Sequence, residues 1–303
     1  MKPVILALLS AAALSADSVS LTYLGTAGWQ IESGKTIVLI DPYFTRAKYP
    51  SPNDAVSADD PRPLVGVNSV VESDAAAIDA HIKRADLLLL THTHPDHALD
   101  MPYIARKTKA RVIGTESTAT VARAYGIPES QIQVVRGGET LKFNGVTIHP
   151  IRSVHGIFRK PPAGWTPGPP PLVRADVTAP MRFGQFQEGG TLAYLLEMGG
   201  HRIIVFGSMN YIESEIAGLR PDIALIGAMP ERHNIDDYTA RIMKALGNPA
   251  LVLPTHWDRF NVPHSVSQAP AVARLQSFLD EIKAASPGTK VIVPSYFQAI
   301  TVP

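Results

Sequence analysis

The chain contains no cysteine among its 303 residues, which excludes disulfide bonds and thiolate metal ligands. Charged residues make up only 18% of the sequence, the formal net charge is +1, and no segment gathers the lysine and arginine run that a nucleic-acid backbone requires. After the N-terminus, no apolar run approaches the ~20 residues of a membrane-spanning helix. With 45% hydrophobic residues, the sequence instead predicts a globular protein with a sizeable core, without nucleic-acid partners or transmembrane segments.

The N-terminus has the pattern of a secretory signal. Lys2 supplies the positive start, residues 4–14 are apolar, and residues 11–16 are small enough for cleavage. We therefore predict a signal peptide at residues 1–16, a mature chain that begins near Asp17, and a periplasmic or secreted protein. The alternative interpretation of the same residues is a first buried strand or helix.

The rest of the chain, residues 17–303, is predicted to form a single domain. Residues 20–41 alternate between apolar segments and glycine breaks, which indicates a β-meander. A helix is expected at about residues 73–84 and a strand at 85–91, after which strands alternate with helices, so the order differs from a simple doubly wound fold. Two connections rich in proline, at residues 45–72 and 157–189, are expected to form the walls or a lid of a pocket.

The segment L-T-H-T-H-P-D-H crowds potential metal ligands directly behind an apolar strand. If the strand continues through His92 and His94, their side chains point the same way and can bind one ion. Asp96 and His97 follow Pro95, where the chain turns, and suit a second ion better. Nitrogen and oxygen ligands favour zinc, which takes about four ligands per ion, so further ligands must come from elsewhere in the chain.

Two other histidines occupy comparable positions. His155 in I-R-S-V-H-G and His256 in L-V-L-P-T-H-W-D each end an apolar strand. A histidine at a strand end is more often structural, but beside the H-x-H-x-D-H motif we interpret both as ligands. Trp257, His233 and His264 are candidates for substrate binding, against the simpler interpretation that they only pack or lie at the surface.

These motifs together resemble the metallo-β-lactamase superfamily. The resemblance runs from about Leu21 to His256 and includes L-T-Y-L-G-T-A-G-W-Q-I-E-S, I-V-L-I-D-P, the histidine motif, I-I-V-F-G-S and P-T-H-W. It implies an α/β fold, the αββα sandwich, with two mixed β-sheets face to face, helices outside and metals at one edge. The opening strands look most like the branch that includes ascorbate-phosphate lactonase and N-acyl-phosphatidylethanolamine phospholipase D.

The resemblance also implies roles for individual residues. One zinc would be bound by His92, His94 and His155, and the other by Asp96, His97 and His256. Asp41 would steady the ligand loop, or alternatively would only end a strand.

One position departs from the pattern of most hydrolases in the superfamily. An aspartate that bridges both metals is replaced here by Ser208. The loss leaves the cluster more positive, which should weaken binding of the second ion and attract anionic substrates. Metallo-β-lactamases of the third subclass also have serine there, so β-lactam hydrolysis is one alternative function, and a non-catalytic metal-binding descendant is another.

The sequence thus predicts an exported hydrolase with one or two zinc ions. A metal-bound hydroxide would attack a lactone, ester or phosphodiester, and Asp96 would both bind metal and pass a proton to the leaving group.

Overall fold

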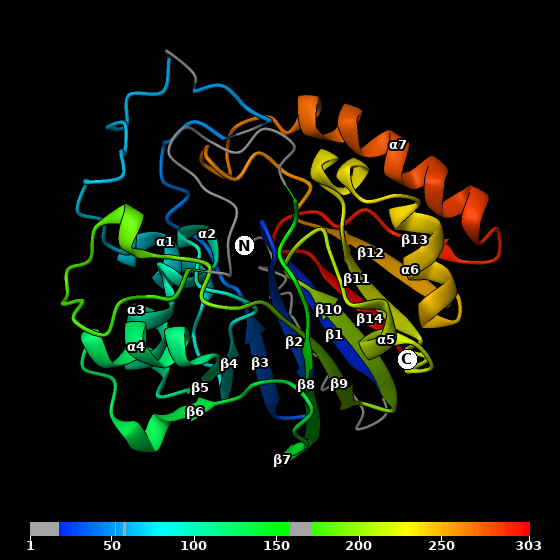
Figure 1. Cartoon of the computed structure of the whole chain (residues 1–303), viewed down its shortest axis with the longest axis horizontal. Coiled ribbons are helices and arrows are strands. Elements are labelled where there is room, and N and C mark those ends of the chain that lie inside the picture. The colour runs from blue at the N-terminus through cyan, green and yellow to red at the C-terminus, as the bar shows by residue number, and fades with distance from the viewer. Residues whose placement is uncertain (1–17, 52, 57–58, 158–170) are drawn as a thin grey trace, which may run out of the picture.

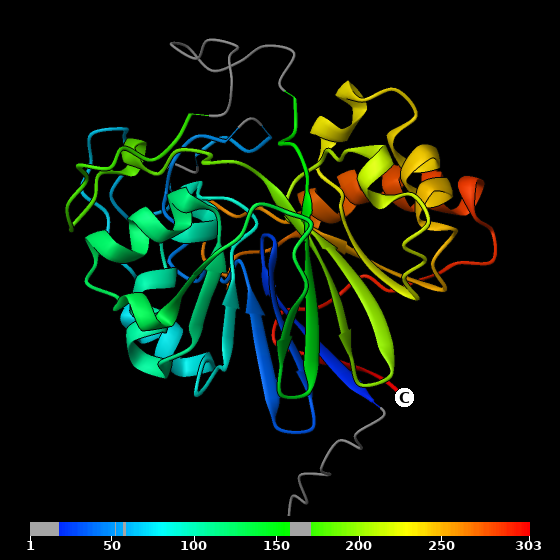
Figure 2. The same cartoon turned by 60° about the horizontal axis from the view of Figure 1, so that its bottom comes forward.

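The computed structural model describes residues 18–51, 53–56, 59–157 and 171–303, and the predicted signal peptide lies outside these ranges. Two seven-stranded sheets face each other, and helices cover their outer faces (Figures 1 and 2). The expected αββα sandwich is therefore confirmed. No helix in the described ranges is long and apolar enough to span a membrane.

The first sheet has the strand order β14-β1-β2-β3-β4-β5-β6. Its strands are β1 (Val19–Gly25), β2 (Gly28–Ser33), β3 (Thr36–Ile40), β4 (Leu87–Leu89), β5 (Arg111–Gly114), β6 (Ile132–Val134) and β14 (Ala299–Val302). The pairs from β14 to β3 are antiparallel, which confirms the predicted meander, and those from β3 to β6 are parallel.

The second sheet repeats this arrangement in the order β13-β12-β11-β10-β9-β8-β7. Its strands are β7 (Leu141–Phe143), β8 (Val146–Arg152), β9 (Leu192–Met198), β10 (His201–Phe206), β11 (Ile223–Gly227), β12 (Leu251–Thr255) and β13 (Lys290–Val291). Pairs from β7 to β10 are antiparallel and pairs from β10 to β13 are parallel, so both sheets are mixed.

The helices divide between the two outer faces (Figure 1). On the first sheet lie α1 (Ala75–His81), α2 (Pro95–Ala98), α3 (Met101–Thr108) and α4 (Glu116–Ala124), and on the second α5 (Glu213–Ile216), α6 (Tyr238–Leu246) and α7 (Ala269–Ala285). Three short 3₁₀ helices are η1 (Glu129–Gln131), η2 (Phe183–Gln185) and η3 (Pro230–Asn234).

Strand β3 shows why the sandwich needs helices outside. Val38 and Ile40 point into the core between the sheets, whereas Ile37 and Leu39 pack in a second core under the helices. A strand that is apolar on both faces must be covered on both sides. Burial of both faces fixes the register of β3 and thereby the position of the residue that follows it, Asp41.

Candidate metal centre

The candidate ligands gather at one edge of the sandwich, where several strands end. Asp41 follows β3, the histidine motif follows β4, His155 follows β8, Ser208 follows β10 and His256 follows β12. Strands β3 and β4 are parallel, as are β10 to β12, and β8 shares the direction of β10 because both are antiparallel to β9. The carboxyl ends of all these strands therefore meet at the same edge, the usual place for a site in such sheets.

The histidine motif itself is a loop followed by a helix. Strand β4 ends at Leu89, so the expected continuation of the strand through His92 and His94 is wrong. His94 instead precedes the first turn of α2, with φ −59° and ψ 154°, and Pro95 begins that helix. Proline suits this position because its missing N–H would be unsatisfied there and its φ is already helical. Asp96 and His97 then lie in the helical turn, which confirms that the chain turns at Pro95.

The structure brings the six predicted donors together in two groups. The donor atoms of His92, His94 and His155 lie within 4.8 Å of one another. Those of Asp96, His97 and His256 do the same. The rings of His92 and His97 are 3.8 Å apart between centroids, so the two groups adjoin. Each group offers three protein donors, which leaves a position open on each of two ions.

Hydrogen bonds orient several of these ligands. Asp41 Oδ2 lies 2.8 Å from His97 Nδ1, so the Nε2 atom of His97 faces the centre. Thr91 donates its backbone N–H to Asp41 Oδ1 at 2.8 Å and its hydroxyl to Oδ2. His155 Nδ1 lies 3.0 Å from the carbonyl oxygen of Gly156. These contacts restrict the rings before any metal binds.

Two of the site residues have left-handed backbone conformations, which side chains other than glycine rarely adopt. Asp41 has φ +42° and His256 has φ +50°. The N–H of His256 donates to the carbonyl of Thr26 at 2.6 Å, which holds the end of β12 against the β1–β2 turn. Such strain persists only where surrounding contacts impose it, and it gathers at functional sites.

Burial keeps the first group of histidines neutral. It lowers the pKa of His94 to about 3 and that of His155 to about 4, and it holds the pKa of His92 well below its usual value, with the neighbouring histidines adding to the effect. A neutral imidazole is the form that binds metal. His92 Nε2 is buried and has no hydrogen-bond partner in the described part of the chain.

The second group has a different balance. Burial opposes the charge of Asp96, yet His97 and His256 beside it hold its pKa below the usual range. For His97, burial acts to lower the pKa, but the carboxylates of Asp96 and Asp41 raise it overall. Asp96 Oδ2 lies 3.3 Å from His256 Nε2 and 3.6 Å from His97 Nε2. This group therefore contributes the negative charge of the site.

Ser208 lies beside the site, and its Oγ accepts a hydrogen bond from the N–H of Gly156 at 2.9 Å. The serine therefore anchors the segment that carries His155. The preceding Gly207 is a functional position that sequence reasoning missed. A Cβ there would collide with the hydroxyl of Thr91 and would lie 2.6 Å from Asp41 Oδ2. Only glycine lets β10 approach this pair of residues so closely.

A cavity of about 290 Å³ opens over the two groups of donors. All six donors line this cavity. The other lining residues are Tyr49, Pro50, Pro95, Phe183, Met209, Met229, Glu231 and Phe260. Tyr49 and Pro50 come from the first predicted loop and Phe183 from the second, so the expectation that both loops form walls of the pocket is confirmed for their described residues. The walls are mostly apolar.

The three candidates for substrate binding lie away from this lining. Trp257 is buried and stacks on Tyr23 with centroids 6.1 Å apart. His233 faces Glu281, with Nε2 3.1 Å from Oε1, in a separate depression. His264 lies with Nε2 2.9 Å from the carbonyl of Leu24. None of these three side chains therefore lines the cavity.

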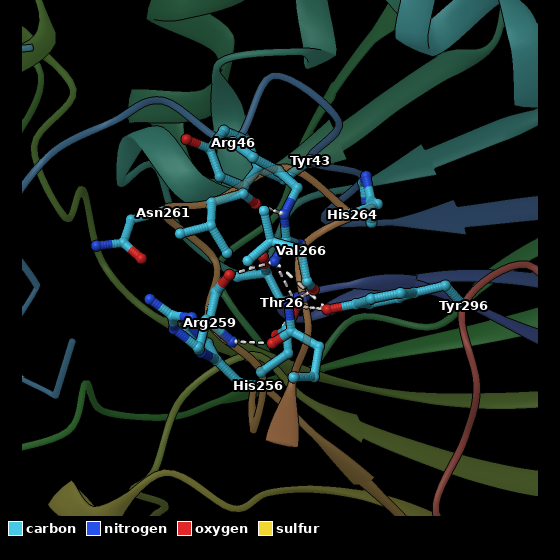
Figure 3. A network of polar contacts seen from close by, with 12 residues as sticks. Thr26, Tyr43, Arg46, His256, Arg259, Asn261, His264, Val266 and Tyr296 are labelled. Atoms are coloured by element: carbon cyan, nitrogen blue, oxygen red, sulfur yellow. Dashed lines mark hydrogen bonds and ion pairs between the residues drawn. The ribbon is translucent and has the colours of Figure 1, made fainter. Parts of the chain in front are cut away.

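A buried ion pair holds the loops behind the site (Figure 3). Arg46 donates to Asp258 Oδ2 at 2.8 Å, and both side chains are almost fully buried. Arg46 also donates to the carbonyls of Val262 and Arg259, and Tyr296 donates to Asp258 Oδ2 at 2.6 Å. The first loop and the segment after His256 are therefore joined by charge-assisted hydrogen bonds, which are stronger than neutral ones.

A family profile described as "Beta-lactamase superfamily domain" matches residues 20–256. The chain belongs to this superfamily. A UPF0173 metal-dependent hydrolase of Ruegeria pomeroyi is 25% identical over 290 residues, which cover 94% of this chain and all of the relative. The similarity to this relative therefore extends over nearly the whole chain.

Solved structures with this beta-lactamase superfamily fold differ in their chemistry. A metallo hydrolase of the archaeon Ignicoccus hospitalis has a TM-score of 0.60 and 19% identity, over 94% of this chain and 99% of that chain. The diiron β-hydroxylase CmlA of Streptomyces venezuelae has a TM-score of 0.56 and 15% identity, over 94% of this chain and 54% of that chain. Likeness at this identity shows the fold alone, and the function must be argued from the site.

The donor set of this superfamily member fits two divalent ions. Five imidazoles and one carboxylate are arranged in two adjoining groups, and the partnerless Nε2 of His92 is a buried atom that a metal would satisfy. Imidazole and carboxylate ligands suit zinc, while iron and other first-row metals accept the same ligands.

Proposed function

We propose that the protein is a metal-dependent hydrolase that binds two divalent ions, zinc in the first place, and cleaves the ester bond of a small lactone or carboxylic ester. One observation carries the proposal: two groups of three donors adjoin at the floor of a cavity whose walls are mostly apolar. The similarity to the metal-dependent hydrolase of Ruegeria pomeroyi supports the proposal, because it covers the whole length of that relative.

Each group of donors would hold one ion. His92, His94 and His155 would bind the first, and Asp96, His97 and His256 the second. When bound, such ions polarise the oxygen of a substrate and make coordinated water acidic enough to attack at neutral pH. Ser208 would leave the two ions without a protein carboxylate between them, so we expect the second ion to be held more weakly.

The protein side chains would orient the metal ligands and transfer a proton. Asp41 holds His97 by Nδ1 and so aims the opposite nitrogen at the second ion. The carboxylate of Asp96 is ionised beside His256, and we propose that it accepts a proton during the attack and passes it to the leaving group. Apolar residues around the cavity exclude bulk water, which strengthens every electrostatic contact inside.

The walls favour carbonyl esters over phosphodiesters. No lysine or arginine lines the cavity within the described ranges, and recognition of a phosphate usually employs such cations. Among carbonyl substrates, lactones are preferred on the resemblance of the opening strands and the P-T-H-W segment to the ascorbate-phosphate lactonase and phospholipase D branch.

Hydrolysis of β-lactams is the second candidate function. The observation that favours it is Ser208 at the end of β10, where the third subclass of metallo-β-lactamases also has serine. The same lack of a lining cation counts against it, because common β-lactams carry a carboxylate that a cation would bind. A non-catalytic descendant is disfavoured, since loss of function should have removed several of the six donors.

The decisive experiment combines metal analysis of the purified protein with a hydrolysis screen over lactones, phosphodiesters, β-lactams and thioesters. His94→Ala should remove metal and abolish turnover while the sandwich stays folded, because apolar strands build its core. His149→Ala is the matched control. His149 is on β8, outside both groups of donors, and its Nε2 lies 3.7 Å from Oε1 of Glu197 on β9. Full metal content and turnover in His94→Ala would refute the assignment.

We further propose that the enzyme is exported. Protein recovered from the native cell envelope should begin near Asp17, whereas a soluble cytoplasmic form that retains Met1 would contradict export.

A further inference from the structure

The wall of the cavity contains one carboxylate that belongs to neither group of donors. Glu231 lies in η3, directly after the segment that follows β11, and only 6% of its surface is exposed. Its Oε1 accepts a hydrogen bond from Asn53 Nδ2 at 2.8 Å. Its Oε2 is buried and has no hydrogen-bond partner among the described residues. The carboxylate is therefore half satisfied.

Such a group is costly in this environment. A buried acceptor without a partner lowers stability, and more so when it is charged. Tyr49, Met229 and Phe260 also line the cavity, and Met229 and Phe260 pack in one apolar cluster with Tyr49 against it. Met229 and Phe260 cannot supply a donor, and the Tyr49 hydroxyl, which could, is not a partner of Oε2.

The adjacent arginine does not meet this demand. Arg232 is fully buried, and its guanidinium is occupied by Glu281 at 2.8 Å, by Ser277 Oγ and by the carbonyls of Ala228 and Met229. No arginine or lysine lines the cavity in the described ranges. Glu231 lines the cavity, so no cation of the lining competes with a bound molecule for its carboxylate.

We propose that Glu231 determines specificity by binding a protonated amine or a comparable N–H donor of the substrate. The inference rests on the proposed function and deepens it: the substrate would be a small, largely apolar ester or lactone that carries an ammonium group. A cavity of about 290 Å³ lies at the lower end of the range for small-molecule sites, which fits such a compact molecule. The metals would bind the carbonyl end of the substrate, and Glu231 would bind its cationic end.

Binding of thiols tests this inference without knowledge of the substrate. Thiolates bind zinc and cobalt directly, so a series of aminoalkanethiols with two to six carbons would place an ammonium group at increasing distances from the metals. Each is compared with the alkanethiol of the same length. Dissociation constants are measured by calorimetry on the zinc-loaded protein, and the absorption of the cobalt-loaded protein reports the thiolate bond.

In the wild type, at least one aminoalkanethiol should bind about tenfold or more tightly than its neutral counterpart, as expected for a charged hydrogen bond. In Glu231→Gln this ratio should fall to about one, while binding of the neutral thiols stays unchanged. Glu231→Met provides a second variant of similar volume that removes the unsatisfied oxygen, and it should lose the ratio in the same way.

Glu188→Gln is the matched control. Glu188 is also buried near the site and accepts from Thr191, but it does not line the cavity, so the ratio should persist. Equal affinity for both thiols at every length in the wild type, or an unchanged ratio in both Glu231 variants, would overturn the inference while leaving the metal centre intact. Failure of every thiol to bind the metal-loaded protein would instead overturn the metal centre and, with it, the role of Glu231.

Discussion

Asp41 Oδ2 lies 2.8 Å from His97 Nδ1, and this contact links the end of β3 to the helical turn that carries the ligands. Asp41 is fully buried and is itself fixed by the N–H and the hydroxyl of Thr91. Its carboxylate selects the tautomer of His97 that offers Nε2 to a metal and makes that atom a better donor.

The first prediction follows from this contact. Asp41→Asn should weaken binding of the second ion about 10–100-fold, because a neutral amide no longer fixes and polarises His97. Calorimetric titration of the metal-free protein with zinc should resolve the loss, with the site of His92 little affected. Asp86→Asn, at the opposite end of β3 and β4, serves as the control. Equal loss in both variants would mean that Asp41 only supports the fold.

The second prediction concerns Ser208. Ser208→Asp should tighten the second ion, because a carboxylate would then lie between two cations and could still accept from the N–H of Gly156. Ser208→Asn has nearly the same shape without the charge and should leave the affinity close to that of the wild type. Chelator titration compares the three proteins. Two ions of equal affinity in the wild type, together with no gain in Ser208→Asp, would indicate that another residue already bridges the metals.

The third prediction tests the close approach at Gly207. Gly207→Ala should displace Thr91 and Asp41, because the added methyl group has no room beside them. We expect reduced zinc affinity and a loss of roughly 1–3 kcal/mol in the free energy of unfolding. Gly288→Ala, where a Cβ would meet no atom within 4 Å, should change neither quantity. Wild-type zinc binding in Gly207→Ala would contradict the role assigned to this glycine.

The fourth prediction concerns pH. Burial raises the pKa of Asp100 to about 6, although Thr45 and Phe44 donate hydrogen bonds to it. Because the folded pKa exceeds the unfolded value, the contribution of Asp100 to stability should fall as the pH rises from about 4 to about 6. Relative to Asp100→Asn, the loss over this range should reach at most about 3 kcal/mol.

Urea unfolding of the metal-free proteins at several pH values measures this difference. Asp79 is the contrasting case, because its hydrogen bond with Lys107 lowers its pKa, so the corresponding comparison with Asp79→Asn should have the opposite sign. A pH-independent difference between the wild type and Asp100→Asn would show that Asp100 is not perturbed.

The sandwich and the two sets of three donors could be predicted from the resemblance to the superfamily, because its motifs lie at the ends of apolar strands. Apolar strands such as β3 and β12 end directly at Asp41 and His256, and their register follows from burial. The conformation of His92 and His94 could not be predicted in this way, because β4 ends at Leu89, two residues before the end of the predicted strand at residue 91.

The individual residues that line the cavity could not be predicted, although the two loops that supply some of them could. Tyr49, Phe183 and Glu231 come from segments without periodic patterns, and only tertiary contacts bring them together. Trp257 directly follows the ligand His256 in the sequence, yet its side chain stacks on Tyr23. Sequence proximity does not determine side-chain direction at the end of a strand, where the backbone leaves the pleat.

Backbone hydrogen bonds join the two wall segments to each other. Val71 donates to the carbonyl of Met181, Phe183 to that of Ser69 and Gly184 to that of Val67, and the rings of Tyr49 and Phe183 lie 4.7 Å apart. The residues that these segments contribute to the cavity lining are thus different from the six donors. Insertions or exchanges in these segments can create a new substrate preference during evolution while the inherited ligand set stays untouched, so relatives that share all six donors need not share a substrate.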